Sequence, residues 1–143
     1  AISFGLLPAF VTLGADPPVW PPGWITVAAA LLGVGAHFAN ALPDIVDDLA
    51  TGVRGLPARL GARWAALVAA GCLATAGALL AAGSGSLTEP AGAGLLAINM
   101  VLSATIAGWV LAAPRTRSRM PFRLAMLVAV LDVVLLIGAG TAI

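Results

Sequence analysis

Lysine and tyrosine are absent from this sequence, and cysteine and histidine each occur only once. Because Cys72 has no second cysteine to pair with, no disulfide bond can form within the chain. The seven cationic residues, all arginines, exceed the acidic residues by one, so the net charge at pH 7 is +1. That is too little positive charge for a surface that binds DNA or RNA. The sequence therefore excludes a scaffold held by intrachain disulfides and predicts no nucleic-acid partner.

Charged residues are also scarce, at 9% of the chain, whereas hydrophobic residues make up 61% and the mean hydropathy is +1.06. A typical soluble domain has about a quarter of its residues charged. We therefore predict an integral membrane protein of the all-α class, built as a bundle of transmembrane helices. Its length of 143 residues suits one domain.

The apolar segments predict four full membrane crossings and one partial one. Residues 1–14 would span only about 21 Å as a helix, short of the roughly 30 Å hydrocarbon core. The chain begins with alanine inside this apolar segment, so we expect it to be the C-terminal part of a longer protein. Four prolines make residues 15–23 an extramembrane loop. Full crossings are predicted for residues 24–42, 62–83, 90–113 and 122–138.

The first full crossing carries two local signals. Gly33 and Gly35 are predicted to let neighbouring helices approach closely. Pro43 lacks a backbone N–H, so the helix is expected to kink or restart there and to continue as a short helix to about Ala50. Gly52 is expected to end that short helix. In the third crossing, Thr88 is predicted to be the N-cap.

Residues 40–61 concentrate charge beside this crossing, with three of the six acidic residues and two of the seven arginines. Asn40, Asp44 and Asp48 recur every four residues, so on one continuous helix they would share a stripe, about 40° and 6 Å apart. Crowded carboxylates repel each other unless a cation lies between them. Mg²⁺ prefers oxygen ligands and usually completes its shell with water and substrate phosphates. The stripe therefore predicts a magnesium–diphosphate site at a membrane face.

The stretch resembles the second aspartate-rich motif of the UbiA superfamily of intramembrane prenyltransferases. The resemblance rests on the pattern N-x-x-x-D-x-x-x-D from Asn40 to Asp48, followed by Gly52, Arg54, Leu56, Pro57, Arg59, Leu60 and Gly61. It implies that the chain forms about half of a helical barrel and lacks an N-terminal half with a matching motif. It also implies Mg²⁺ as cofactor, and prenyl transfer from an isoprenyl diphosphate to a lipid or aromatic acceptor with release of pyrophosphate.

The resemblance and the spacing together select four candidate metal ligands. Asp44 and Asp48 are predicted to act in catalysis by holding Mg²⁺ against the diphosphate. Asp47 points roughly 100° away from Asp48 on a helix, so it either binds a second Mg²⁺ or faces water. Asn40 offers an uncharged oxygen ligand and substrate contact, or alternatively a hydrogen bond between helices.

Three further residues near the motif have competing interpretations. Arg54 and Arg59 are predicted to bind the diphosphate, because a guanidinium fits phosphate oxygens, although retention of positive charge on the inner side explains them equally well. His37 lies one turn from Asn40 and is expected to pack or hydrogen-bond rather than to bind metal.

Asp132 lies about 15 Å into the last predicted crossing, near the membrane midplane. An ionisable group at that depth is functional by default. The alternatives are that Asp132 is buried against a polar neighbour such as Asn99, or that it stays protonated.

The arginines also predict sidedness, because all seven fall on one side of the predicted crossings. Asp16 and Glu89 lie in the opposite loops, which carry no cation. By the positive-inside rule, the arginine side and the motif face the cytoplasm of a multi-pass protein, which we expect in a bacterial cell membrane.

Several departures from the UbiA pattern limit the prediction. The chain has no second aspartate-rich motif and no counterpart of the family's central-loop tyrosine or lysine, and Gly55 stands where the family often has serine or threonine. We therefore expect these 143 residues alone to be inactive. The rivals are a CDP-alcohol phosphotransferase, whose later D-x-x-x-D is missing after Ala58-Arg59, and a non-catalytic membrane subunit or transporter fragment.

Overall fold

The structure, a computed structural model, describes residues 2–112 and 119–140, and all regular secondary structure in those ranges is helical. The predicted all-α class is therefore confirmed for the described residues. The helices are α1 (Ile2–Leu13), α2 (Gly23–Ala41), α3 (Ile45–Ala50), α4 (Leu56–Gly83), the short 3-10 helix η1 (Ser86–Thr88), α5 (Pro90–Ala112) and α6 (Met120–Gly140).

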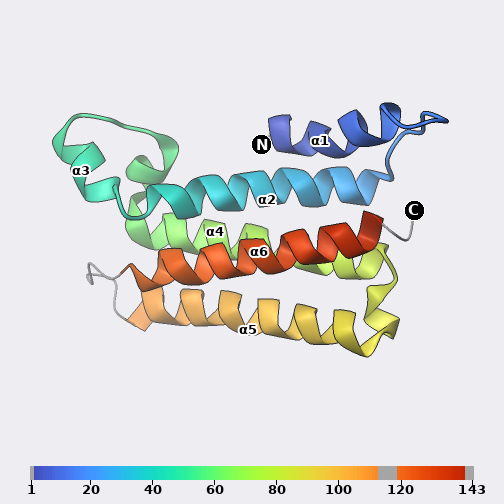
Figure 1. Cartoon of the computed structure of the whole chain (residues 1–143). Coiled ribbons are helices and arrows are strands. Elements are labelled where there is room, and N and C mark those ends of the chain that lie inside the picture. The colour runs from blue at the N-terminus through green and yellow to red at the C-terminus, as the bar shows by residue number, and fades with distance from the viewer. Residues whose placement is uncertain (1, 113–118, 141–143) are drawn as a thin grey trace.

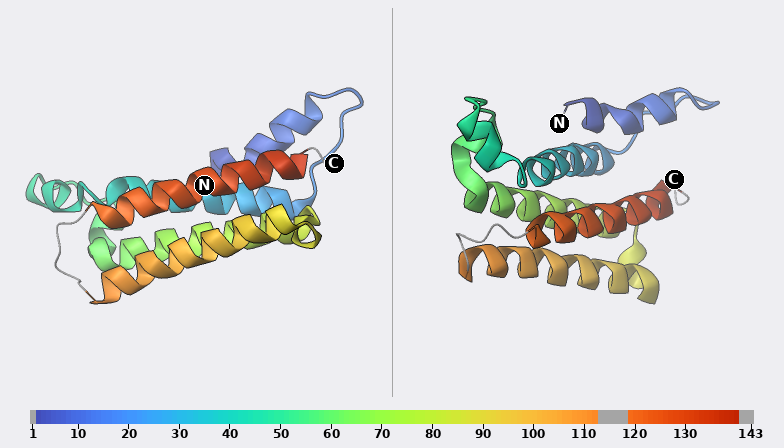
Figure 2. Two further views of the ribbon diagram at one scale, coloured as in Figure 1. Left: turned by 60° about the horizontal axis from the view of Figure 1, so that its bottom comes forward. Right: turned by 60° about the vertical axis from the view of Figure 1, so that its left-hand side comes forward.

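The long helices lie side by side and alternate in direction along the chain (Figure 1). α4 is the centre of the bundle, because it packs against α2, α5 and α6. α1 packs on the outer side of α2, and α3 lies beyond the end of α2, where it contacts α4 (Figure 2). The connections between helices therefore gather at two opposite ends of the bundle.

Three of the described helices are long and apolar enough to cross a membrane, namely α2, α4 and α5. Their bounds lie close to three of the four predicted crossings. α1 is apolar but shorter, as expected for the partial crossing. α6 coincides with the fourth predicted crossing in the sequence, and its role as a crossing stays a prediction.

The buried face of α4 is made of small and aliphatic residues at helical spacing. Ala65, Ala69, Leu73, Ala76 and Leu80 have no solvent exposure. Steps of three and four residues place these side chains on one stripe of the helix. Small residues matter here because apolar side chains gain little by leaving lipid, so close packing must hold the helices together.

Both glycines predicted to permit close contact do so, on different sides of α2. A Cβ atom on Gly33 would lie 2.6 Å from the Cβ of Phe4 in α1. A Cβ atom on Gly35 would lie 2.8 Å from the Cγ of Leu73 in α4. These separations are too short for carbon atoms, so α2 can pack between α1 and α4 only with glycine at these positions.

The start of α5 differs from the prediction. α5 begins at Pro90, and the preceding Thr88 belongs to η1. The Thr88 hydroxyl donates a hydrogen bond to the carbonyl oxygen of Gly85 at 2.8 Å. The prediction of Thr88 as N-cap is therefore wrong, because its hydroxyl is used within the turn.

Gly35→Ala tests the α2–α4 contact. The added methyl group would collide with Leu73, and overpacking of this kind costs about 1–3 kcal/mol. Gly71→Ala on α4 is the matched control, because no heavy atom lies within 4 Å of its Cβ position. The control should be neutral or stabilising by up to about 1 kcal/mol through helix propensity. Thermal unfolding followed by circular dichroism in detergent separates the two, and equal melting temperatures would contradict the packing described.

Candidate functional site

The motif lies where α2 gives way to α3, at one end of the bundle (Figure 1). α2 ends at Ala41, and Asp44 is the N-cap residue of α3, with φ −100° and ψ −6°. The predicted break at Pro43 and short helix to Ala50 are confirmed. The stripe expected for one continuous helix is interrupted, because Asn40 belongs to α2, Asp44 is the N-cap of α3 and Asp48 lies within α3. The turn enforced by Pro43 separates the two elements.

Burial distinguishes the three carboxylates of α3 and its N-cap. Ile45 is only 3% exposed and anchors the helix to the core. Asp48 lies one turn further along the same side and is half-buried, whereas Asp44 and Asp47 are exposed. Asp48 is therefore the carboxylate closest to the bundle, and Asp47 faces outward, one of the two orientations predicted for it. Asn40 is also exposed.

The C-terminal end of α3 is a Schellman motif, in which two backbone N–H groups close the helix. The N–H of Val53 donates to the carbonyl of Asp48 at 2.8 Å, and the N–H of Gly52 donates to that of Leu49 at 3.4 Å. Gly52 has a φ of +80°, which glycine adopts without strain. Gly52 therefore ends α3 as predicted, and it turns the chain toward Arg54.

Gly61 interrupts the start of α4, with φ 78° and ψ 162° inside an otherwise helical segment. The first turn, which carries Pro57 and Arg59, is thereby set apart from the long helix that follows. This break explains why the crossing was predicted from residue 62 although α4 begins at Leu56. Arg54 and Arg59 are both exposed.

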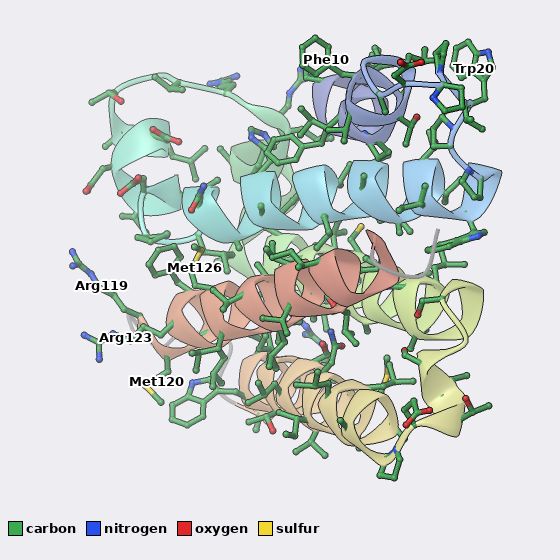
Figure 3. The ribbon with its side chains drawn as sticks, turned by 45° about the vertical axis from the view of Figure 1, so that its right-hand side comes forward. Phe10, Trp20, Arg119, Met120, Arg123 and Met126 are labelled. Atoms are coloured by element: carbon green, nitrogen blue, oxygen red, sulfur yellow. The ribbon has the colours of Figure 1, made fainter. Side chains whose placement is uncertain are left out.

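The described arginines gather at the same end of the bundle as α3, since the helices alternate in direction. Figure 3 shows Arg119, directly before α6, and Arg123 of α6 at this end. Arg54, Arg59 and Arg63 follow α3 in the chain at the same end, whereas Asp16 and Glu89 lie in the connections at the other end. Arg115 and Arg117, which also entered the sidedness prediction, lie outside the described residues.

The motif carboxylates alone do not form a metal cage. Within residues 2–112 and 119–140, no group of three or more Asp, Glu, His or Cys side chains is placed to hold a metal ion. Mg²⁺ is often bound by one or two carboxylates, with water and substrate phosphates as its other ligands. Asp44, which is exposed, and Asp48, which is half-buried, lie one turn apart and are carboxylates of the type that such an ion uses.

His37 lies on the exposed surface of α2, one turn before Asn40. Its ring meets that of Phe38 edge-on, with ring centroids 5.9 Å apart. A ring contact of this kind agrees with the packing role expected for His37.

The opposite end of the bundle has a cavity of about 500 Å³ beside η1. Its lining includes Ser84, Thr88, Glu89 and Val134. It is open to the surroundings and has a single ionisable group in its lining. Its chemistry therefore gives less reason to expect a ligand than the motif does.

Asp132 is fully buried and accepts a hydrogen bond from Asn99. The Nδ2 atom of Asn99 lies 2.5 Å from the Oδ1 atom of Asp132. Of the alternatives considered for Asp132, burial against a polar neighbour such as Asn99 is the one that the structure shows. Sequence reasoning missed the two other residues of this region, Ser103 and Gly77. The spacing of four between Asn99 and Ser103 was the available signal for the first.

Comparisons with known protein families, with curated proteins and with solved structures gave no match to this chain.

Gly61→Ala tests whether the break in α4 depends on glycine. The Cβ position is in open space, so any cost comes from the backbone alone. A conformation of this kind costs a non-glycine residue about 1–3 kcal/mol. Gly55→Ala is the control, because its φ of −61° suits any residue, and it should change stability by less than about 0.5 kcal/mol. Chemical denaturation in detergent measures both, and a neutral Gly61→Ala variant would show that the break is not glycine-dependent.

Proposed function

We propose that this chain is part of an intramembrane prenyltransferase resembling the UbiA superfamily. In this proposal it helps to transfer a prenyl group from an isoprenyl diphosphate to a lipid or aromatic acceptor, with release of pyrophosphate. The observation that carries the proposal is the position of Asp44 and Asp48. They lie at the N-cap of α3 and within α3, at the end of an apolar helical bundle that also carries the described arginines.

The proposed arrangement in the membrane uses all the long helices. α6 is the fourth full crossing and α1 the partial one, so the chain makes up about half of a helical barrel. The end that carries the described arginines faces the cytoplasm, in accordance with the positive-inside rule. A bacterial cell membrane is the proposed location. The motif would then meet water-soluble Mg²⁺ and the charged head of the donor at the membrane surface.

Each motif residue has a proposed role toward the diphosphate. Asp44 and Asp48 hold the Mg²⁺-bound diphosphate, with Asn40 offering an amide oxygen and Asp47 available for a second ion. When bound, Mg²⁺ neutralises the charge that develops on the leaving pyrophosphate. Arg54 and Arg59 contribute by the same electrostatic principle, because guanidinium groups match phosphate oxygens.

The apolar helices supply the other half of the proposed chemistry. The prenyl chain is a hydrocarbon, and the faces of α2, α4 and α5 offer it an apolar environment. Exclusion of water from this region would protect an allylic cation from hydrolysis. The division between a charged end and an apolar length is what the reaction requires.

A non-catalytic membrane subunit is the second candidate, favoured by the lack of a three-residue metal group among the described residues. In that case the carboxylates of α3 only solubilise the end of the bundle. A CDP-alcohol phosphotransferase is less well supported, because no D-x-x-x-D follows Ala58-Arg59 in the chain.

Binding of a non-reactive prenyl diphosphate analogue to the protein in detergent tests the proposal. Affinity should depend on Mg²⁺ and fall about 10- to 100-fold when Asp44 and Asp48 are both changed to Asn, the range typical for losing metal-site interactions. The double variant Asp16→Asn/Glu89→Gln is the control, because it removes two carboxylates at the opposite end. Equal loss in both variants, or binding that persists in a chelator, would contradict the proposal.

The 143-residue chain and a longer protein that contains it should also differ in turnover. We expect no prenyl transfer by the chain alone, since the matching aspartate-rich motif is absent from its sequence. Prenyl transfer by these residues alone would contradict the expected need for an N-terminal half.

A further inference from the structure

The core of the bundle contains a polar cluster that the proposed reaction does not use. It consists of Asn99 and Ser103 on α5 and Asp132 on α6. Asn99 and Asp132 have no solvent exposure, and Ser103 has 5%. They are the only buried polar or charged residues of the part of the chain that the structure describes. In so apolar a core, the polar atoms of this cluster are expected to find hydrogen-bond partners within the cluster.

Gly77 of α4 closes the third side of this cluster. A Cβ atom on Gly77 would lie 2.5 Å from Asn99 Nδ2 and 2.6 Å from Asp132 Oδ1. The pair therefore packs directly on the α4 backbone. The closeness of this packing leaves no room for an ion between the pair and α4.

The hydrogen bonding of the pair is incomplete as long as Asp132 is a carboxylate. Asn99 donates to Oδ1 of Asp132 through Nδ2. Oδ2 of Asp132 and Oδ1 of Asn99 are both buried and have no partner among the described residues. Both atoms are acceptors in that state, so neither can satisfy the other. An unpartnered buried polar atom costs about 1–3 kcal/mol, and more if it is charged.

Among the described residues, the helices packed against α6 place no charge beside Asp132 that would stabilise a carboxylate. α2, α4 and α5 pack against α6. Their ionisable side chains are His37, Arg59, Arg63 and Cys72, since α5 has none. Arg63 precedes Gly77 by fourteen residues, about 21 Å along α4, and Arg59 lies further away. His37 is exposed near the far end of α2, and Cys72 lies about 7.5 Å before Gly77 along α4.

Arg123, the arginine of α6, is also too far from Asp132 to stabilise a carboxylate. It precedes Asp132 by nine residues, about 13 Å along the helix, and is exposed. An isolated carboxylate in an apolar environment is strongly unfavourable and takes up a proton instead. A proton on Asp132 would therefore supply the missing hydrogen-bond donor and would remove the need for a counter-charge.

We propose that Asp132 is a proton-binding site, and that its neutral carboxylic acid forms a cyclic acid–amide pair with Asn99. In this pair Nδ2 of Asn99 donates to Oδ1 of Asp132, and the proton on Oδ2 of Asp132 is donated to Oδ1 of Asn99. The proton comes from water, and no other co-reactant is needed. The pair joins α5 to α6 through two hydrogen bonds and places both helices against Gly77. It is independent of the proposed prenyl transfer.

Infrared spectroscopy at neutral pH tests the proposal on the whole chain in detergent. The remaining five acidic residues, Asp16, Asp44, Asp47, Asp48 and Glu89, are exposed or half-buried and lie outside the cluster to which the proposal assigns a proton. The wild-type spectrum should therefore show the carbonyl stretch of one protonated carboxylic acid. Asp132→Asn should abolish this band, and Asp48→Asn should leave it unchanged. No acid band in the wild type, or a band that survives Asp132→Asn, would overturn the proposal.

Variants of the neighbours test the pairing itself. Asn99→Leu removes both hydrogen bonds and should shift the acid band to higher frequency, whereas Ser103→Ala should leave it in place. A shift in Ser103→Ala alone would assign the proton to a different acceptor and overturn the pairing.

Thermal unfolding provides a readout that does not depend on the band. Asp132→Asn keeps an uncharged partner of the same shape and should melt within a few degrees of the wild type. Asn99→Leu removes both hydrogen bonds, at about 1 kcal/mol each, and should melt lower by roughly 4–8 °C, at about 2–4 °C per kcal/mol for a chain of this size. Stability that depends on sodium or potassium ions in the wild type and not in Asp132→Asn would show a bound cation instead of a proton and would overturn the proposal.

Discussion

The bundle depends on how closely α4 can approach its neighbours. Helices in lipid gain little from burying apolar side chains, so contact between small residues must hold them together. The alanine-rich stripe of α4 and Gly35 of α2 provide that contact on one side, and Gly77 provides it on the other. Gly77 also lets Asn99 and Asp132 pack directly against the α4 backbone. Close helix packing and the buried polar pair therefore depend on the same contact.

The alternating direction of the helices determines at which end of the bundle the charged residues gather. Because consecutive long helices run in opposite directions, the α2–α3 turn, the start of α4 and the start of α6 meet at one end. The charged residues of the motif are concentrated there. They follow the end of α2 at Ala41 and therefore lie outside the long helices. Pro43 and Gly52 define the beginning and end of the exposed turn, which is therefore encoded locally.

The sequence predicted the helices well, because apolar run length, proline and glycine act locally. It also offered Asn99 as a neighbour of Asp132 in one of several alternatives, since a buried carboxyl group needs a polar neighbour. The break at Pro43 was predicted as well, but the four-residue spacing of Asn40, Asp44 and Asp48 treats the three as one helical stripe, which that break interrupts. The sequence did not predict the contact of Gly77 with the polar pair. That contact depends on which helices meet, which no local pattern specifies.

Hydrogen–deuterium exchange of the backbone amides tests the central claim, that the turn after α2 holds a diphosphate through Mg²⁺, most directly. With Mg²⁺ and a prenyl diphosphate analogue together, exchange in residues 42–61 should slow, and with either alone it should not. Slowing that needs no Mg²⁺, or that appears at the cavity around Ser84 and Glu89 instead of at the motif, would contradict the account.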